Sequence, residues 1–213
     1  MAKAKPKPQT LDVPPFPPLT WDEYSWVGEL TLPSWADFQS RGGAYGARSS
    51  RKRSDGTTRL RVAVDDSELE EDAPRPPPSA AQAAAMRYLL DNEARVAEAV
   101  LGAIFEQYPE NRANYGDDYD LSEAELNKRL PELSDPSELK KLMGLSNVHV
   151  LYVESAKLAY IGFEFGCFWE AEHGAGVMTH RSRVAAIGHA DTSFLEWIAE
   201  DDAKKHKRKK RKK

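Results

Sequence analysis

The sequence predicts an α+β fold: a mainly antiparallel sheet that ends in a C-terminal β-meander, with helices packed on one face and disordered tails. Strand-like patterns occur between residues 24 and 64, helical spacing occupies 79–144, and strand patterns return at 147–188. Strands and helices that occur in separate runs are typical of α+β domains.

Composition predicts one folded domain between two tails. Residues 1–20 include six prolines, which predicts a disordered, proline-rich segment. Nine of the last ten residues, 204–213, are Lys or Arg and none is apolar, which predicts a disordered polybasic tail. Residues 21–203 then form a single domain with one core, interrupted by a flexible acidic and proline-rich linker at 65–78.

The net charge of −4 hides an asymmetry. Because the tail holds nine positive charges, residues 1–203 carry −13. An acidic body argues against a DNA-binding surface on the folded domain, since phosphate contacts need clustered Lys or Arg. The tail at 204–213 could hold nucleic acid or an anionic surface without specificity, or could stay solvated or fold back on the acidic body.

Cysteine content and hydropathy indicate the compartment. Cys167 is the only cysteine, so no intramolecular disulfide can form and a reducing environment is expected. The N-terminal residues contain no uninterrupted apolar run, and no segment resembles a membrane span. We therefore expect a cytoplasmic protein with no membrane span.

The first run of elements precedes the linker. Residues 24–32 predict one strand, and residues 58–64 predict a second, half-buried one. Residues 34–47 contain three glycines within five positions and predict an ordered loop. Asp55-Gly56 predicts a hairpin turn.

Helical signals follow the linker. Ser79 is the predicted N-cap of a helical pattern that forms one helix, or two that meet near 91–92, and that Pro109 ends. Two short helices are predicted next, at 121–130, which begins with a Ser-x-x-Glu capping box, and at 135–144.

Gly144 is the predicted C-cap of the last of these helices, and the pattern then changes to that of strands. The turns between the strands are short enough for an antiparallel meander, and an amphipathic helix at 192–202 closes the domain. The four predicted strands are 147–153, 157–169, 175–180 and 183–188.

The second meander strand contains the lone cysteine. Alternation places one set of residues on the core face: Ala159, Ile161, Phe163, Phe165, Cys167 and Trp169. A cysteine among large apolar side chains is more often an inert core residue than a nucleophile.

Residues 170–176 connect this strand to the next. Gly174 and Gly176 are available for positive φ, and Glu170 and Glu172 can accept turn N–H groups, with His173 as a donor to one of them. This interpretation makes the segment an architectural turn.

A functional interpretation of the meander remains open. Its acids and histidines, if brought together, could bind a divalent ion or act as an acid–base pair; they are Glu164, Glu170, Glu172, His173, His180, His189 and Asp191. The catalytic candidates are Glu170, Glu172, His173 and Asp191, and the metal candidates are Glu172, His173, His180 and His189. No His-Glu-x-x-His spacing and no second cysteine support the metal site.

Segment 159–194 resembles the C-terminal signature of an uncharacterised bacterial domain family, a domain of unknown function. The matching positions are Gly162, Phe165, Cys167, Trp169, Glu170, Glu172, His173, Gly174, Gly176, Val177, His180, Gly188, Ala190, Asp191, Thr192 and Phe194. Glu170 stands where the family pattern has aspartate. The motif residues with an expected structural role are Gly162, Cys167, Trp169, Gly174, Gly176, Thr192 and Phe194.

The resemblance implies no assigned reaction. Some related small domains look like immunity or toxin-neutralising proteins, which makes a protein-binding domain without catalysis or cofactor the leading expectation. An acidic body would suit a basic toxin as partner. The alternative is a metal-dependent, hydrolase-like enzyme that uses the Glu, His and Asp cluster of the meander. A third hypothesis is nonspecific nucleic-acid binding through residues 204–213.

Overall fold

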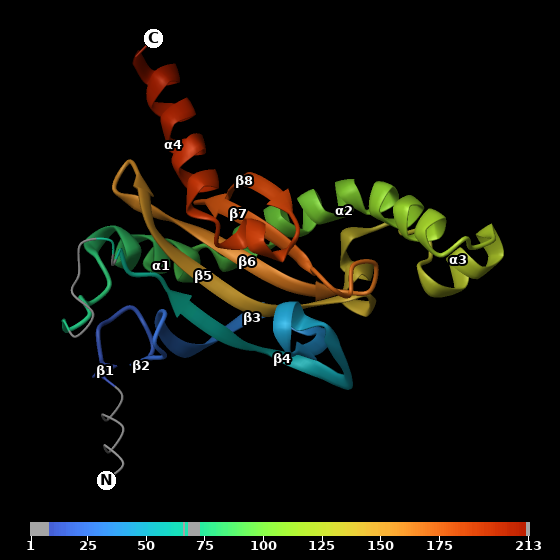
Figure 1. The fold of residues 1–213 in the computed structure, drawn as a ribbon, viewed down its shortest axis with the longest axis horizontal. Coiled ribbons are helices and arrows are strands. Elements are labelled where there is room, and N and C mark those ends of the chain that lie inside the picture. The colour runs from blue at the N-terminus through green and yellow to red at the C-terminus, as the bar shows by residue number, and fades with distance from the viewer. Residues whose placement is uncertain (1–8, 66, 68–72, 212–213) are drawn as a thin grey trace.

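An eight-stranded sheet organises the part of the chain that the structure, a computed structural model, describes: residues 9–65, 67 and 73–211 (Figure 1). The strands are β1 (Thr10–Leu11), β2 (Leu19–Trp21), β3 (Trp26–Gly42), β4 (Arg48–Val62), β5 (Met143–Ser155), β6 (Leu158–Cys167), β7 (Ala175–His180) and β8 (Arg183–Gly188). The α-helices are α1 (Ala80–Asp91), α2 (Glu93–Asp118), α3 (Glu123–Arg129) and α4 (Glu196–Arg211), and the 3-10 turns are η1 (Ala44–Gly46), η2 (Pro136–Lys141) and η3 (Ala190–Ser193).

The strands lie side by side in chain order, and their pairing is antiparallel except between β4 and β5. Those two strands are parallel because the helical segment α1–η2 separates them in the chain and returns it to the same end of the sheet. The predicted α+β class, the mainly antiparallel sheet and the C-terminal meander are confirmed.

The main core lies on one face of the sheet, under α1 and α2. Helix residues such as Met86 and Ile104 pack there with inward-facing strand residues such as Val148 and Phe163. A second, smaller cluster lies on the opposite face, where Ala199 of α4 packs on Tyr160. The predicted placement of helices on one face therefore holds for α1 and α2, whereas α4 covers the other face (Figure 1).

Strands β3 and β4 are longer than the sequence predicted. The expected loop at 34–47 is instead largely strand, because Trp35 and Phe38 are anchored in the core, and register shifts let β3 bend. The Asp55-Gly56 hairpin prediction is also wrong. Gly56, at φ 90°, lies inside β4, where an added Cβ would meet the Leu32 carbonyl oxygen at 2.5 Å.

Both predicted tails contain regular structure. In the segment 1–20, residues 1–8 are not among those described, but β1 and the start of β2 form because Phe16 and Leu19 are buried in the core. At the other end, α4 continues through the basic residues to Arg211, where disorder was predicted from 204. Ala203 anchors this helix at 5% exposure, and Lys and Arg are good helix formers, so the helix propagates.

The helical segment follows the sequence prediction in part. Ser79 caps α1 in a reciprocal capping box with Gln82, the break between α1 and α2 falls at Asn92, and α3 begins at its predicted capping box. Pro109 does not end α2, because buried contacts hold the helix on both sides of it.

The predicted helix at 135–144 is a 3-10 turn, η2, that ends at Lys141. Gly144 is therefore not a C-cap. It lies in β5, where an added Cβ would come within 1.9 Å of the Gln39 carbonyl oxygen, so the glycine allows β3 to cross closely.

The predicted linker at 65–78 is anchored at its end. Residues 66 and 68–72 are not described, and residues 73–78 contain no helix or strand. The indole Nε1 of Trp26 donates a hydrogen bond to the Pro76 carbonyl at 2.8 Å.

Among the helices of the described ranges, none has the length and apolar character that a membrane crossing requires.

Candidate functional site

A row of polar residues crosses the sheet on the face opposite the main core. Arg59 of β4 pairs in register with Asn147 of β5, which in turn pairs with Glu164 of β6. One step along, Arg61 pairs with His149. Because successive side chains of a strand point to opposite faces, the apolar neighbours of these residues enter the core while the polar ones share one surface.

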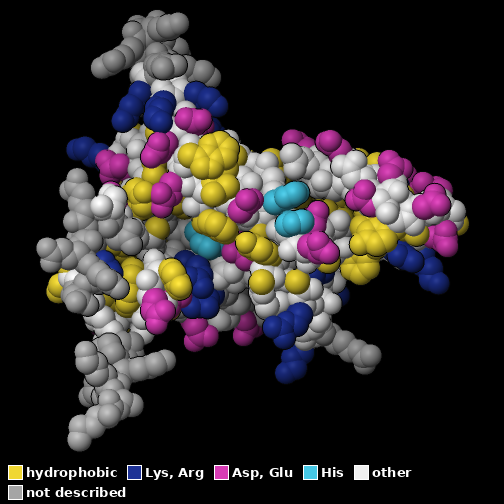
Figure 2. Space-filling model, in the orientation of Figure 1, with side chains coloured by type: hydrophobic (Ala, Val, Ile, Leu, Met, Phe, Trp, Pro, Cys, Tyr) yellow, Lys and Arg dark blue, Asp and Glu magenta, His cyan; other side chains and the backbone are white. Residues whose placement is uncertain are grey.

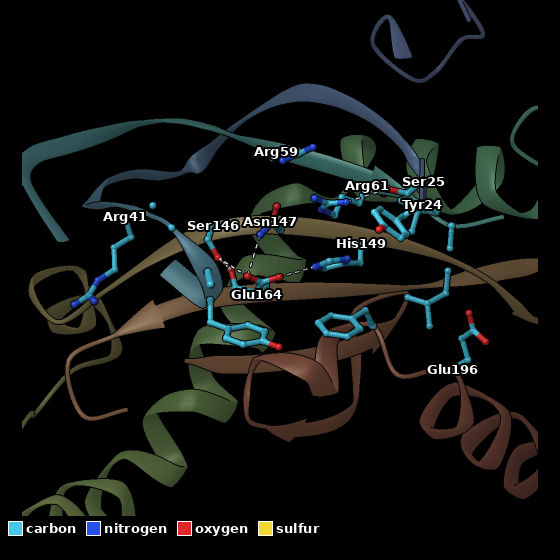
Figure 3. A pocket seen from close by; sticks show the side chains of 18 of the residues that line it. Tyr24, Ser25, Arg41, Arg59, Arg61, Ser146, Asn147, His149, Glu164 and Glu196 are labelled. Atoms are coloured by element: carbon cyan, nitrogen blue, oxygen red, sulfur yellow. Dashed lines mark hydrogen bonds and ion pairs between the residues drawn. The ribbon is translucent and has the colours of Figure 1, made fainter. Parts of the chain in front are cut away.

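Glu164 is the centre of this row and is only 4% exposed. Its Oε1 accepts hydrogen bonds from Asn147 Nδ2 at 2.9 Å and Ser146 Oγ at 3.2 Å, and its Oε2 lies 2.8 Å from His149 Nε2 (Figure 3). Burial acts to raise the pKa of Glu164, but these hydrogen bonds and the charge of His149 outweigh it and lower the pKa. The carboxylate is therefore held ionised.

The Glu164 contact sets the tautomer of His149. An ionised carboxylate only accepts hydrogen bonds, so Nε2 of His149 carries a proton. The ring also packs against Phe194, with centroids 5.1 Å apart. Its Nδ1 makes no hydrogen bond to a described residue, and the side chain keeps 11% exposure. This second ring nitrogen is thus available to a ligand.

The dyad of Glu164 and His149 lines a pocket of about 840 Å³, which suits a small ligand (Figure 3). Arg59 and Arg61 lie at its edge, and Asp22 Oδ2 holds both guanidinium groups, at 2.8 and 3.0 Å. Arg61 also donates to Ser25 Oγ at 3.0 Å. These contacts orient the two cations and leave some of their five N–H donors for a ligand.

Turn η1 and Phe194, the residue after η3, line the pocket, and glycines let both turns approach the sheet. An added Cβ at Gly162 would lie 1.6 Å from the Ser193 carbonyl oxygen, and one at Gly176 would lie 2.4 Å from that of His189. On the other side, an added Cβ at Gly166 would lie 2.1 Å from the Gly46 carbonyl oxygen. Gly162 and Gly176 thus place η3, and with it Phe194, beside the dyad.

Arg41 lines part of the pocket, but its guanidinium is hydrogen-bonded to the protein's own backbone and to Gln39. Its guanidinium donates to Gln39 Oε1 and to the carbonyl oxygens of Gly46, Leu142 and Cys167, and Figure 3 shows it directed away from Glu164. Burial lowers the pKa of Arg41. The residue ties η1 to the ends of β5 and β6.

Three of the predicted site residues come together elsewhere. Glu170 Oε1 accepts from the backbone N–H of His173 at 3.3 Å and lies 3.1 Å from its Nδ1, so it closes the turn. His189 stacks on His173 with centroids 5.2 Å apart, and its Nε2 lies 4.0 Å from Glu170 Oε2. All three side chains are solvent-accessible, at 31% to 64% exposure.

The other predicted members do not join this group. Glu172 is exposed in the turn, Asp191 lies in the first turn of η3, and His180 Nε2 donates to the Ser155 carbonyl at 2.8 Å. Across the described ranges, no three His, Cys, Asp or Glu side chains are placed to hold a metal ion. The predicted Glu, His and Asp cluster of the meander is therefore not assembled.

The remaining motif residues have structural roles in packing. Cys167 is fully buried, as its strand position predicts, and burial raises the pKa of its thiol to about 12. Trp169 packs edge-on against Tyr108 at 5.4 Å. Gly174 has φ 62°, as predicted, but Gly176 lies in β7 without positive φ and is needed for the approach of η3.

Thr192, also a motif residue, is buried in η3, and its Oγ1 would lie 2.6 Å from a Cβ added at Gly188. This places a third glycine beneath the same turn.

Sequence reasoning included Glu164 but missed His149. The signal was present: in "NVHV", Asn147 and His149 alternate with two valines, as Arg59 and Arg61 alternate with Leu60 and Val62. Polar residues at alternate positions of two strands predict a shared polar face. The parallel pairing of β4 with β5, which joins them, was not predictable from spacing.

These features define an α+β domain with an open, mostly antiparallel sheet and a polar, ligand-sized pocket on one face. A family model matches residues 27–195, and the chain belongs to that family, a domain of unknown function (DUF6985). The match begins within β3 and ends just before α4, so it leaves out β1, β2 and α4 and includes the rest of the sheet and helices α1–α3. No curated protein and no solved structure matches the chain significantly.

Proposed function

We propose that this domain binds a small polar ligand in the pocket above Glu164 and His149. The observation that carries the proposal is the buried dyad, whose outer imidazole nitrogen has no hydrogen-bond partner among the described residues and faces a pocket of about 840 Å³. Burying an ionised group is costly, and perturbed carboxyl groups in clefts concentrate at functional sites.

The geometry selects the chemistry of the ligand. His149 Nδ1 can share a hydrogen bond with a hydroxyl or amine of a ligand, and the free N–H groups of Arg59 and Arg61 favour a carboxylate or phosphate. Phe194 offers an apolar wall. The ligand class is therefore a small hydroxy- or amino-substituted anion.

The side-chain ¹⁵N signals of His149 test this proposal. A panel of hydroxycarboxylates, amino acids and sugar phosphates is titrated into the protein, and a ligand of the expected class shifts the Nδ1 signal. Arg61→Gln should weaken the interaction by about tenfold or more, the value of a lost charged hydrogen bond. Arg129→Gln on α3 is the control. A panel that leaves the His149 signals unchanged contradicts the proposal.

Protein binding, the leading expectation from the sequence, is the second candidate, and an exposed aromatic patch favours it. Tyr115 packs on Tyr119 at 4.6 Å and on Phe168 at 6.1 Å, and Tyr119 and Phe168 are 60% and 41% exposed. Figure 2 shows hydrophobic and acidic side chains together over the α2 end of the molecule. Aromatic side chains beside acids suit a basic protein partner; the expected toxin would be one such protein.

The aromatic patch is tested by a double substitution, Tyr119→Ala with Phe168→Ala. The measurement is whether a protein binds to the wild-type domain and to this variant. This candidate is supported by a protein that binds the wild type but not the variant, and that still binds the wild type after it has been purified. Retention that is equal for both proteins contradicts it.

A further inference from the structure

A second pocket, at the end of the sheet, shares no residue with the dyad pocket. It measures about 670 Å³ and lies between the β7–β8 turn at 181–182, the β5–β6 turn at 156, the α1 and α2 residues Tyr88 and Arg95, and the α4 residue Lys207. Four separate parts of the chain thus meet around it.

The charge of this pocket is opposite to that of the protein. Its lining includes Arg95, Arg181, Arg183 and Lys207 and no Asp or Glu, although the whole chain carries −4. Arg183 is neutralised by Asp202, with Nη1 to Oδ1 at 3.0 Å. Arg95, Arg181 and Lys207 form no ion pair with any residue in the described part of the chain.

Hydroxyl groups accompany these cations. Ser182 follows Arg181 in the turn, and its Oγ lies 3.5 Å from the Tyr88 hydroxyl. Arg181 itself has φ 59°, a left-handed conformation that is strained for a non-glycine residue. The turn therefore presents a cation and one hydroxyl beside the Tyr88 hydroxyl of α1, at some cost in backbone strain.

The pKa of His180 reflects its burial and the positive charge around this pocket. Its pKa is lowered first by burial, against which hydrogen bonds to backbone carbonyls act, and further by the charges of Arg183 and Arg181. The imidazole Nε2 already donates to the Ser155 carbonyl, so the histidine does not relieve the repulsion among the cations. An anion would relieve it.

We propose that this pocket binds a small compound with adjacent phosphate groups, whose oxygens are bound by Arg95, Arg181 and Lys207. Guanidinium groups match phosphate oxygens in pairs, and the two hydroxyls can donate to the same oxygens. A compact phosphate compound is favoured over a nucleic-acid strand because the site is a pocket between four parts of the chain.

Calorimetry on the full chain with pyrophosphate as the probe tests the proposal at low salt, about 50 mM. Arg95→Gln with Arg181→Gln should weaken pyrophosphate binding by about a hundredfold, because each of the two lost charged hydrogen bonds is worth about tenfold or more. Lys128→Gln with Arg129→Gln on α3 removes the same charge elsewhere and should change the affinity less than twofold. Unchanged thermal melting confirms that each variant folds.

Four results would overturn the proposal. The first is no heat of pyrophosphate binding to the wild-type protein, and the second is an equal loss in the α3 control. The third comes from the tail: if Lys209→Gln with Arg211→Gln weakens pyrophosphate binding as much as the pocket variant does, the tail is the binding element. The fourth is a short DNA duplex whose binding pyrophosphate does not compete with. That result would show that the basic residues form a nucleic-acid surface and not a pocket for a small phosphate compound.

Discussion

Nε2 of His149 lies 2.8 Å from Oε2 of Glu164, and the two residues are only 8% and 4% exposed. They belong to neighbouring antiparallel strands and point to the face that α1 and α2 do not cover. Asn147 and Ser146 donate to the same carboxylate, so the charge is hydrogen-bonded on both oxygens. Removing any member of this group leaves a buried polar atom unpaired.

Glu164→Gln should lower the free energy of unfolding by about 1–3 kcal/mol. The amide has one acceptor and one donor side, so at least one of the donors from His149, Asn147 and Ser146 loses its partner. Urea denaturation measures the effect. Glu172→Gln, at an exposed position of the β6–β7 turn, is the matched control and should stay within about 0.5 kcal/mol of wild type.

The stabilising effect of Glu164 should depend on pH. Because folding lowers the pKa of Glu164 from its ordinary value of 4.5, the folded state favours the ionised carboxylate. This contribution is complete above the unfolded pKa and is lost as pH falls through the folded one. The difference in unfolding free energy between wild type and Glu164→Gln should therefore shrink below about pH 4.5. A difference that grows with acidification would contradict the ionised state.

Gly162→Ala should displace η3. Its Cβ would lie 1.6 Å from the Ser193 carbonyl oxygen, so backbone must move, and overpacking of this kind costs about 1–3 kcal/mol or more. Because η3 leads into Phe194, ligand binding in the dyad pocket should weaken as well. Thermal melting and the His149 titration measure the two effects.

Gly102→Ala is the control for the glycine experiment. Gly102 lies in α2 with nothing within 4 Å of an added Cβ. Alanine is the better helix former by about 1 kcal/mol, so this substitution should raise the melting temperature. Equal destabilisation at both glycines would show that the approach of η3 is not what requires Gly162.

Cys167 should resist thiol reagents in the folded protein. It is fully buried, and burial raises its pKa to about 12, so almost no reactive thiolate forms near neutral pH. Labelling with a chromogenic disulfide should be slow in native buffer and complete in guanidinium chloride. Rapid labelling of the native protein would instead favour the nucleophilic role that the strand pattern argues against.

Patterns within one element were predictable from the sequence. The alternation that places Phe163 and Cys167 in the core, the capping box of α3 and the four meander strands all depend on neighbours in the chain. Predictions that rested on a local breaker were wrong at Pro109, Gly56 and Gly144. In each case a contact with a distant segment outweighed the local preference, because buried packing is worth more than the propensity of one residue.

The amino-acid order by itself determined which side chains face in or out of each strand, and thereby that Glu164 and Cys167 lie on opposite sides of the sheet. Only the tertiary structure decided which strands are neighbours. The parallel pairing of β4 with β5 brings Arg61 beside His149, although the two residues are 88 positions apart in the chain. Which strands pair, and in which register, depends on how the whole core packs. Residue spacing along the chain therefore does not predict it.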